Sequence, residues 1–287
     1  MKQKILTIQE IYKKGAEKLK EAGVIEYQLD AWYLLEYVTG ISRAMYYAEP
    51  ERELSEEKRK QYDYYISKRC QRIPLQHITG EQEFMGLKFL VNEHVLIPRQ
   101  DTEILVEETL RILKGGERIL DMCTGSGCIL LSLLKLTKAD GVSGMGSDVS
   151  EEALKVAKEN ARKLCVNAEF VQGDLFENIS LDQKFDVIVS NPPYIPTDVI
   201  DGLQDEVKLH DPYIALDGKK DGLHFYRRII NGSVHYIENR GWLMFEIGHD
   251  QGEAVKYLME EAGYVNICVK KDLAALDRVV IGMYNEE

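Results

Sequence analysis

The sequence has few cysteines, and their spacing does not suit a metal site or a disulfide framework. There are five in 287 residues, an odd number, and no Cys-x-x-Cys pair or neighbouring pair of histidines accompanies them. Structural zinc sites and small disulfide scaffolds depend on such spacing. We therefore expect reduced thiols and no metal.

Long apolar runs are also lacking. A membrane-spanning helix needs about 20 consecutive apolar residues, and no uncharged apolar stretch approaches that length. The amino-terminal segment has no signal-peptide core. We expect a cytoplasmic protein of ordinary globular composition, with 45% hydrophobic and 29% charged residues, and a length that suits one large and one small domain.

The chain has no excess of positive charge. Its net charge is −12, and residues 1–72 contain 14 Lys or Arg against 12 Asp or Glu, which leaves −14 for the remainder. Nucleic-acid binding depends on many Lys and Arg contacts with phosphate. An acidic large domain opposes such contacts, so direct nucleic-acid binding is disfavoured and a protein substrate is the stronger candidate.

Helix signals dominate residues 1–72. Thr7 and Glu10 form a capping box ahead of an apolar pattern with helical spacing. Ser42 and Ser55 are typical N-cap residues for two later helices. These signals predict a small helical bundle.

Residues 73–97 do not continue the helical pattern of residues 1–72, and a third segment begins at residue 98. Pro74 breaks the last helix, and glycines separate short apolar alternations in residues 73–97, which we interpret as a β-hairpin linker. Residues 98–287 alternate strand and helix patterns, which is typical of an α/β fold with a doubly wound, mostly parallel sheet. Strands are predicted at 118–123, 142–147, 168–172, 185–190, 241–247, 265–269 and 278–284.

A glycine-containing turn follows the first strand of the large domain. Its residues are Thr124, Gly125, Ser126, Gly127 and Cys128. Glycines at a strand-to-helix turn let the backbone approach a ligand and direct free N–H groups at it. The dinucleotide fingerprint requires a further small residue where this chain has Leu130, which argues against NAD or FAD.

Acidic residues follow the second and third strands. Asp148 lies 21 residues after Gly127, the spacing at which a carboxylate reaches ribose hydroxyls. Asp174 follows the next strand and is placed to meet an adenine amino group, with Leu175 or Phe176 packing on the ring. Each acid alone is also explained as a helix N-cap, but their joint placement predicts a nucleoside site.

The stretch Asn191, Pro192, Pro193 and Tyr194 ends the fourth strand of this domain. Proline cannot extend a sheet ladder, so these residues lie just past the strand's carboxyl end, where open α/β sheets bind ligands. The rigid Pro-Pro pair allows the Asn191 side chain and the Pro192 carbonyl to face one amino group, with Tyr194 stacking on its plane. A plain loop is the alternative explanation.

Together these motifs resemble the methyltransferases with a seven-stranded Rossmann-like sheet, and most closely the release factor glutamine N5-methyltransferases, the PrmC or HemK family. The similarity covers nearly the whole chain. The matching segments are Arg72 to Gly80, Val95 to Glu103, Asp121 to Gly127, Asn191 to Ile195, Asp217 to Arg228 and Phe245 to Gly248. The chain departs from the family pattern at Gln100 and Lys219, in loops that carry no chemistry.

The resemblance implies that S-adenosylmethionine is the cofactor and that a glutamine side-chain amide is methylated in the Gly-Gly-Gln motif of peptide chain release factors. It implies catalytic roles for Asn191, Pro192 and Tyr194, with Pro193 as a further substrate contact, and recognition of the protein substrate by the helical bundle. Two alternatives stay open at this point. One is an adenine-N6 or guanine-N2 nucleic-acid methyltransferase, and the other is a non-catalytic nucleoside-binding adaptor.

Overall fold

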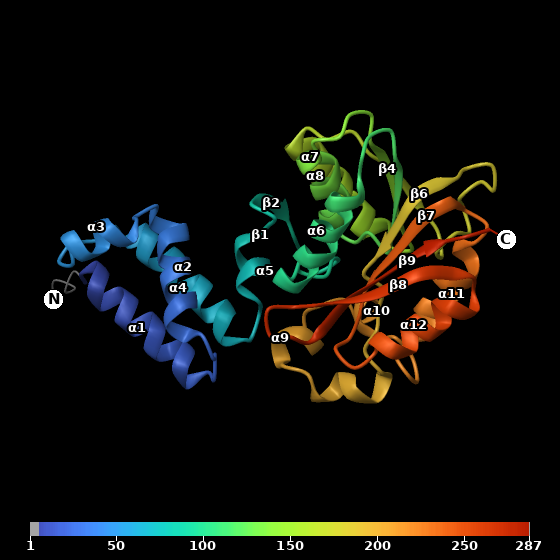
Figure 1. Ribbon diagram of the computed structural model, residues 1–287. Coiled ribbons are helices and arrows are strands. Elements are labelled where there is room, and N and C mark those ends of the chain that lie inside the picture. Colours follow the sequence, from blue (N-terminus) through green and yellow to red (C-terminus); the bar gives the residue numbers. More distant parts are fainter. Residues whose placement is uncertain (1–5, 287) are drawn as a thin grey trace. The chain divides into compact units, whose positions relative to one another are not determined.

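The computed structural model describes residues 6–286 and forms two compact units (Figure 1). The helical unit comprises the chain as far as Gly80 together with Asp205–His210, and the sheet unit comprises Glu81–Gln204 and Asp211–Glu287. The outermost residues of the two predicted domains, 1–5 and 287, lie outside the described residues.

The helical unit begins with the predicted capping box. The Thr7 hydroxyl accepts a hydrogen bond from the backbone N–H of Glu10, whose carboxylate accepts one from the Thr7 N–H. The side chains of Ser42 and Ser55 cap their helices as expected. The helices of this unit are α1 (Ile8–Glu21), α2 (Tyr27–Thr39), α3 (Arg43–Ala48), α4 (Glu56–Cys70), α5 (Leu75–Thr79) and α9 (Asp205–Lys208).

Ion pairs join α9 to the rest of the helical unit. Arg69 donates to Asp30 at 2.7 Å and to Glu206 of α9 at 2.9 Å, and Arg72 also donates to Glu206. Burial opposes ionisation of Glu206, but hydrogen bonds from the two arginines outweigh it and hold its pKa below the ordinary value. A segment that is distant in sequence therefore folds as part of this unit.

Part of the stretch predicted as a hairpin linker is helical instead. Residues 75–79 form α5, because Pro74 occupies the N-cap position and Gly80 ends the helix with a φ of 77°, which glycine adopts without strain. Proline was interpreted only as a helix breaker. The hairpin itself is present and shorter than predicted, with strands β1 (Glu81–Phe84) and β2 (Leu87–Leu90).

The sheet unit has the predicted mostly parallel sheet. Within residues 6–286, seven strands form it in the order β5-β4-β3-β6-β7-β9-β8, and β9 runs opposite in direction to the other six. The strands are β3 (Arg118–Met122), β4 (Ser143–Asp148), β5 (Glu169–Gln172), β6 (Phe185–Ser190), β7 (Ile237–Glu246), β8 (Tyr264–Lys271) and β9 (Asp277–Tyr284).

Helices cover both faces of this sheet (Figure 1), and an apolar core lies against each face. On the central strand, Val187 and Val189 pack with α6 and α7, whereas Ile188 packs with α11 and α12, as the two-residue period of a strand requires. The helices are η1 (Gln100–Thr102), α6 (Glu103–Ile112), α7 (Cys128–Leu136), α8 (Glu151–Leu164), η2 (Thr197–Gly202), α10 (Tyr213–Leu216), α11 (His224–Ser233) and α12 (Gly252–Glu261). Among the helices of residues 6–286, none combines the length and apolarity needed to cross a membrane.

Candidate active site

A cavity of about 300 Å³ opens in the sheet unit where β3, β4 and β6 end. The strand order reverses at β3, which has β4 on one side and β6 on the other, and such switch points form ligand sites in open α/β sheets. The predicted site residues that line the cavity are Thr124, Gly125, Ser126, Cys128, Asp148, Asp174, Leu175, Asn191 and Pro193. Gly127, Pro192 and Tyr194 do not line it.

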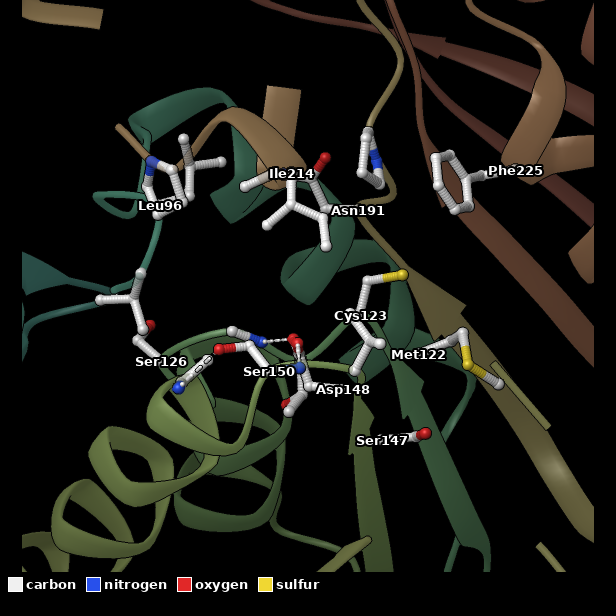
Figure 2. A pocket seen from close by; sticks show the side chains of 18 of the residues that line it. Leu96, Met122, Cys123, Ser126, Ser147, Asp148, Ser150, Asn191, Ile214 and Phe225 are labelled. Atoms are coloured by element: carbon white, nitrogen blue, oxygen red, sulfur yellow. Dashed lines mark hydrogen bonds between the residues drawn. The ribbon is translucent and has the colours of Figure 1, made fainter. Parts of the chain in front are cut away.

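Asp148, the last residue of β4, shapes the turn after β3. Its Oδ2 accepts from the N–H of Gly125 at 2.8 Å, and its Oδ1 accepts from the N–H of Ser150 at 2.9 Å. The N–H of Gly125 is therefore not free for a ligand, contrary to the expectation. Burial raises the Asp148 pKa, although these backbone bonds oppose the effect. Figure 2 places Asp148 and Ser150 at one end of the cavity.

Gly127 supports the turn from outside the cavity. Its φ is 78°, and its N–H donates to the Thr124 carbonyl at 2.8 Å. A Cβ atom here would lie 3.1 Å from the Leu131 side chain and 3.3 Å from Ala157. The position thus requires glycine for both its backbone angle and its close packing.

A buried carboxyl group fixes the base of the same turn. The Thr124 hydroxyl donates to Asp121 Oδ2 at 2.6 Å, and burial raises the Asp121 pKa to about 7. The other oxygen, Oδ1, has no hydrogen-bond partner within residues 6–286.

Asp174 and Leu175 follow β5 at the edge of the cavity. The Arg228 guanidinium of α11 donates to both oxygens of Asp174, at 3.0 and 2.9 Å. The Asp174 carboxylate, which is predicted to meet an adenine amino group, is therefore already held by a bidentate ion pair with Arg228. Leu175 is buried, its φ is 58°, and it lines the cavity.

The tetrapeptide 191–194 is held by contacts with neighbouring segments. Asn191 Nδ2 donates to the Thr102 hydroxyl at 3.4 Å, and the Tyr194 hydroxyl donates to Glu246 Oε1 at 3.3 Å. A Cβ atom on Gly218 would come within 2.7 Å of the Tyr194 backbone, so only glycine fits beside it. The Tyr194 side chain is therefore held by the protein itself. Asn191 is the residue of the tetrapeptide whose polar side chain lines the cavity.

Two walls of the cavity lay outside the site predicted from the sequence. One comes from residues 94–102, and the other from residues 212–228. Leu96, Ile214 and Phe225 belong to these walls and lie with Asn191 at the end of the cavity opposite Asp148 (Figure 2). Both walls overlap segments that match the family pattern, Val95 to Glu103 and Asp217 to Arg228. The resemblance of these segments therefore indicated a functional role that no single residue in them indicated.

The fold and this site define a class, the methyltransferases with a Rossmann-like sheet. Residues 100–204 match the methyltransferase small domain, and residues 10–80 match the PrmC N-terminal domain. A solved methyltransferase from Pyrococcus furiosus shares the fold with a TM-score of 0.54 over 71% of this chain and 91% of that one, at 18% identity.

Relatives over the full length narrow the class to one family. The release factor glutamine methyltransferase of Caulobacter vibrioides is 39% identical over 98% of this chain and 97% of the relative. That of Clostridium acetobutylicum is 42% identical over 94% of this chain and 96% of the relative. The chain belongs to the family of release factor glutamine methyltransferases.

Proposed function

We propose that this chain transfers a methyl group from S-adenosylmethionine to the side-chain amide nitrogen (N5) of the glutamine in the Gly-Gly-Gln motif of peptide chain release factors. Family membership supports the reaction and the substrate. The observation that carries the proposal is the Asn191 side chain, which lines the cavity while its amino group donates to the hydroxyl of Thr102, a neighbouring residue of the cavity wall. Its carbonyl oxygen is thereby left to accept from a substrate.

The residues around the cavity fit S-adenosylmethionine. A volume of about 300 Å³ is at the lower end of the range for small-molecule sites. Asp148 uses one lone pair of each oxygen for backbone N–H groups, so a carboxylate has further lone pairs for ribose hydroxyls. Leu175 supplies an apolar surface for adenine, and the acidic character of the large domain suits a sulfonium ion. When bound, the cofactor supplies an electrophilic methyl group.

The chain's own residues make the substrate nitrogen reactive. An amide nitrogen is a poor nucleophile, because its lone pair is delocalised into the carbonyl. Asn191 is placed to accept one of its N–H bonds, which orients that lone pair and favours pyramidalisation, whereas Pro192, whose carbonyl was expected to accept the other, does not line the cavity. The N–H proton becomes acidic once the nitrogen carries the new bond, so it leaves without a strong base. Tyr194 contributes as an anchor, since its hydroxyl bonds to Glu246 and its carbonyl accepts from Gln251 at 2.9 Å.

The reaction is tested with purified release factor and methyl-labelled S-adenosylmethionine. We expect label in the Gly-Gly-Gln peptide and none in a release factor whose motif is changed to Gly-Gly-Ala. Asn191→Ala should lower kcat by about 10² to 10³, the cost of losing one preorganised polar group at a reacting centre, with a far smaller change in cofactor affinity. Asn191→Asp should keep partial activity, since it still accepts an N–H.

DNA and ribosomal RNA serve as alternative substrates in the same assay. Methylation of nucleic acid without methylation of release factor would contradict the proposal. Wild-type turnover by the alanine variant would contradict the role of Asn191.

A further inference from the structure

A half-exposed ion pair lies in the wall of the cavity. Both oxygens of the Asp174 carboxylate accept from the Arg228 guanidinium, at 3.0 and 2.9 Å, and both residues line the cavity. The Asp174 and Arg228 side chains are 50% and 39% exposed. Ion pairs with this exposure add little to the stability of a fold. Stability therefore does not explain why this pair lies at the cavity.

The order of the strands places the pair at one end of the predicted nucleoside site. β5, β4, β3 and β6 lie side by side in that order. Asp174 follows β5, Asp148 ends β4, and Asn191 follows β6. In S-adenosylmethionine the adenine, the ribose and the sulfonium group follow one another in the same sequence. With the ribose held by Asp148, the adenine is expected on the side of Asp174.

The backbone on both sides of Asp174 is fixed to β4. The N–H of Gly173 donates to the Asp148 carbonyl at 3.0 Å. The Ser147 hydroxyl donates to the Leu175 carbonyl, also at 3.0 Å. The freedom that remains is in the side chain, because the terminal torsion of an aspartate has only a broad preference. Without a partner, the plane of the Asp174 carboxylate would be poorly defined.

We propose that Arg228 is a positioning residue for the base of the cofactor: its guanidinium holds the Asp174 carboxylate in the plane in which it accepts from the 6-amino group of adenine. This inference rests on the proposed function, which requires S-adenosylmethionine. A carboxylate has about four lone-pair sites, and the bidentate pair uses one on each oxygen, so each can accept again. The carboxylate is thereby ordered before the cofactor binds, which favours affinity.

The aromatic residue that follows does not share this role. Phe176, the other residue predicted to pack on the adenine ring, stacks on Tyr236 with ring centroids 4.7 Å apart and does not line the cavity. A Cβ atom on Gly232 of α11 would lie 2.7 Å from the Phe176 ring, so this ring is closely packed against the helix. Asp174 and Leu175 therefore remain as the side chains after β5 that can contact the base.

The first test uses two ligands that differ in one group. They are S-adenosylhomocysteine, the product that remains after methyl transfer, and its analogue in which hydrogen replaces the 6-amino group. By calorimetric titration, the wild-type protein should bind the analogue about 10- to 100-fold more weakly, because a hydrogen bond to a charged group is lost. Arg228→Ala should weaken binding of S-adenosylhomocysteine about 3- to 10-fold, the effect of leaving one side chain to be ordered on binding. Its affinity for the analogue should stay within about twofold of wild type.

Arg227 provides the matched control. It is the preceding residue on α11, and its guanidinium donates to both oxygens of Asp221, at 3.1 and 2.6 Å. Its side chain is 44% exposed, close to the value for Arg228, but it does not line the cavity. Arg227→Ala removes an equivalent ion pair and should leave both affinities within about twofold of wild type.

The second test asks whether the effect of Arg228 passes through Asp174. Asp174→Ala should bind the two ligands with similar affinity, because no carboxylate remains to accept from the amino group. In this background, Arg228→Ala should have no further effect on the binding of S-adenosylhomocysteine. Arg228→Lys keeps the charge but lacks the planar pair of donors, so it should recover little of the lost affinity.

Equal losses for the two ligands in Arg228→Ala would overturn the positioning role, since a change of net charge or of folding would produce them. Unchanged affinity in that variant, a full further loss in the Asp174→Ala background, or complete recovery in Arg228→Lys would do the same. If the wild-type protein fails to methylate release factor, the proposed function is wrong. That result is distinct, because the ligand titrations contain no release factor.

Discussion

Asp148 offers the sharpest test of where the cofactor binds. Its carboxylate accepts from the N–H groups of Gly125 and Ser150, at 2.8 and 2.9 Å, and lines the cavity at the same time. Asp148→Ala therefore removes two backbone contacts as well as any bond to ribose. The loss of ribose bonds to a charged group should weaken S-adenosylmethionine binding by about 1.5 to 3 kcal/mol, or roughly 10- to 150-fold.

A second carboxylate provides the control for the backbone contacts. Glu117 accepts from the N–H groups of Lys114 and Gly115, at 2.7 and 2.8 Å, and is not part of the cavity. Glu117→Ala should lower the free energy of unfolding by an amount similar to Asp148→Ala while leaving the dissociation constant unchanged. The difference between the two variants in cofactor affinity isolates the ligand contact from the structural one.

Calorimetric titration with S-adenosylmethionine measures the affinities, and urea unfolding measures the stabilities. Because burial raises the Asp148 pKa, affinity should also begin to fall at a higher pH than an exposed aspartate would give, as the carboxyl group protonates. An alanine variant that binds the cofactor within a factor of two of wild type would remove Asp148 from the site and refute the reasoning.

Three further predictions concern stability, each measured by denaturant unfolding. Glu206→Gln should cost about 1.5 kcal/mol, the lower end of the range for hydrogen bonds to charged groups, and because the Glu206 pKa is lowered, this difference should be fully present above about pH 4.5 and be lost as pH falls through the lowered pKa. Gly15→Ala should cost about 1 to 3 kcal/mol, since a Cβ atom would overlap the Tyr62 side chain. The Asp121 pKa is raised to about 7, so the contribution of Asp121 to stability should be fully present below about pH 4 and be lost as pH rises to about 7, and Asp121→Asn should remove that pH dependence.

Much of the fold was predictable because its signals are local. Caps such as Thr7 and Ser55 fix helix starts through bonds to residues three positions away, and short apolar runs mark buried strands. The failures involve contacts between distant segments. Nothing in residues 205–210 indicates membership of the helical unit, because that depends on Arg69 and Arg72, more than a hundred residues earlier.

The candidate site was predictable to the extent that topology alone determines it. Residues that follow parallel strands meet at one edge, which is why Asp148, Asp174 and Asn191 converge on one cavity. The opposite walls come from loops and from residues of η1, α10 and α11, whose placement depends on packing rather than on a repeating pattern. Their positions therefore required the structure.

Glu246 was not predicted as part of the site, although the sequence around it indicates an unusual buried acid. It interrupts the buried run Leu243 to Ile247, at the end of a strand whose preceding residues 241–245 are glycine or apolar. A carboxyl group in such a run is too costly to be accidental, so it must have a fixed partner or a task. The parallel register of β6 and β7 brings Glu246 and Asn191 to the same edge of the sheet, so the end of β6 is where such a partner is expected. A charged residue at the carboxyl end of a buried parallel strand should therefore be treated as part of the site, even when no family motif assigns it a role.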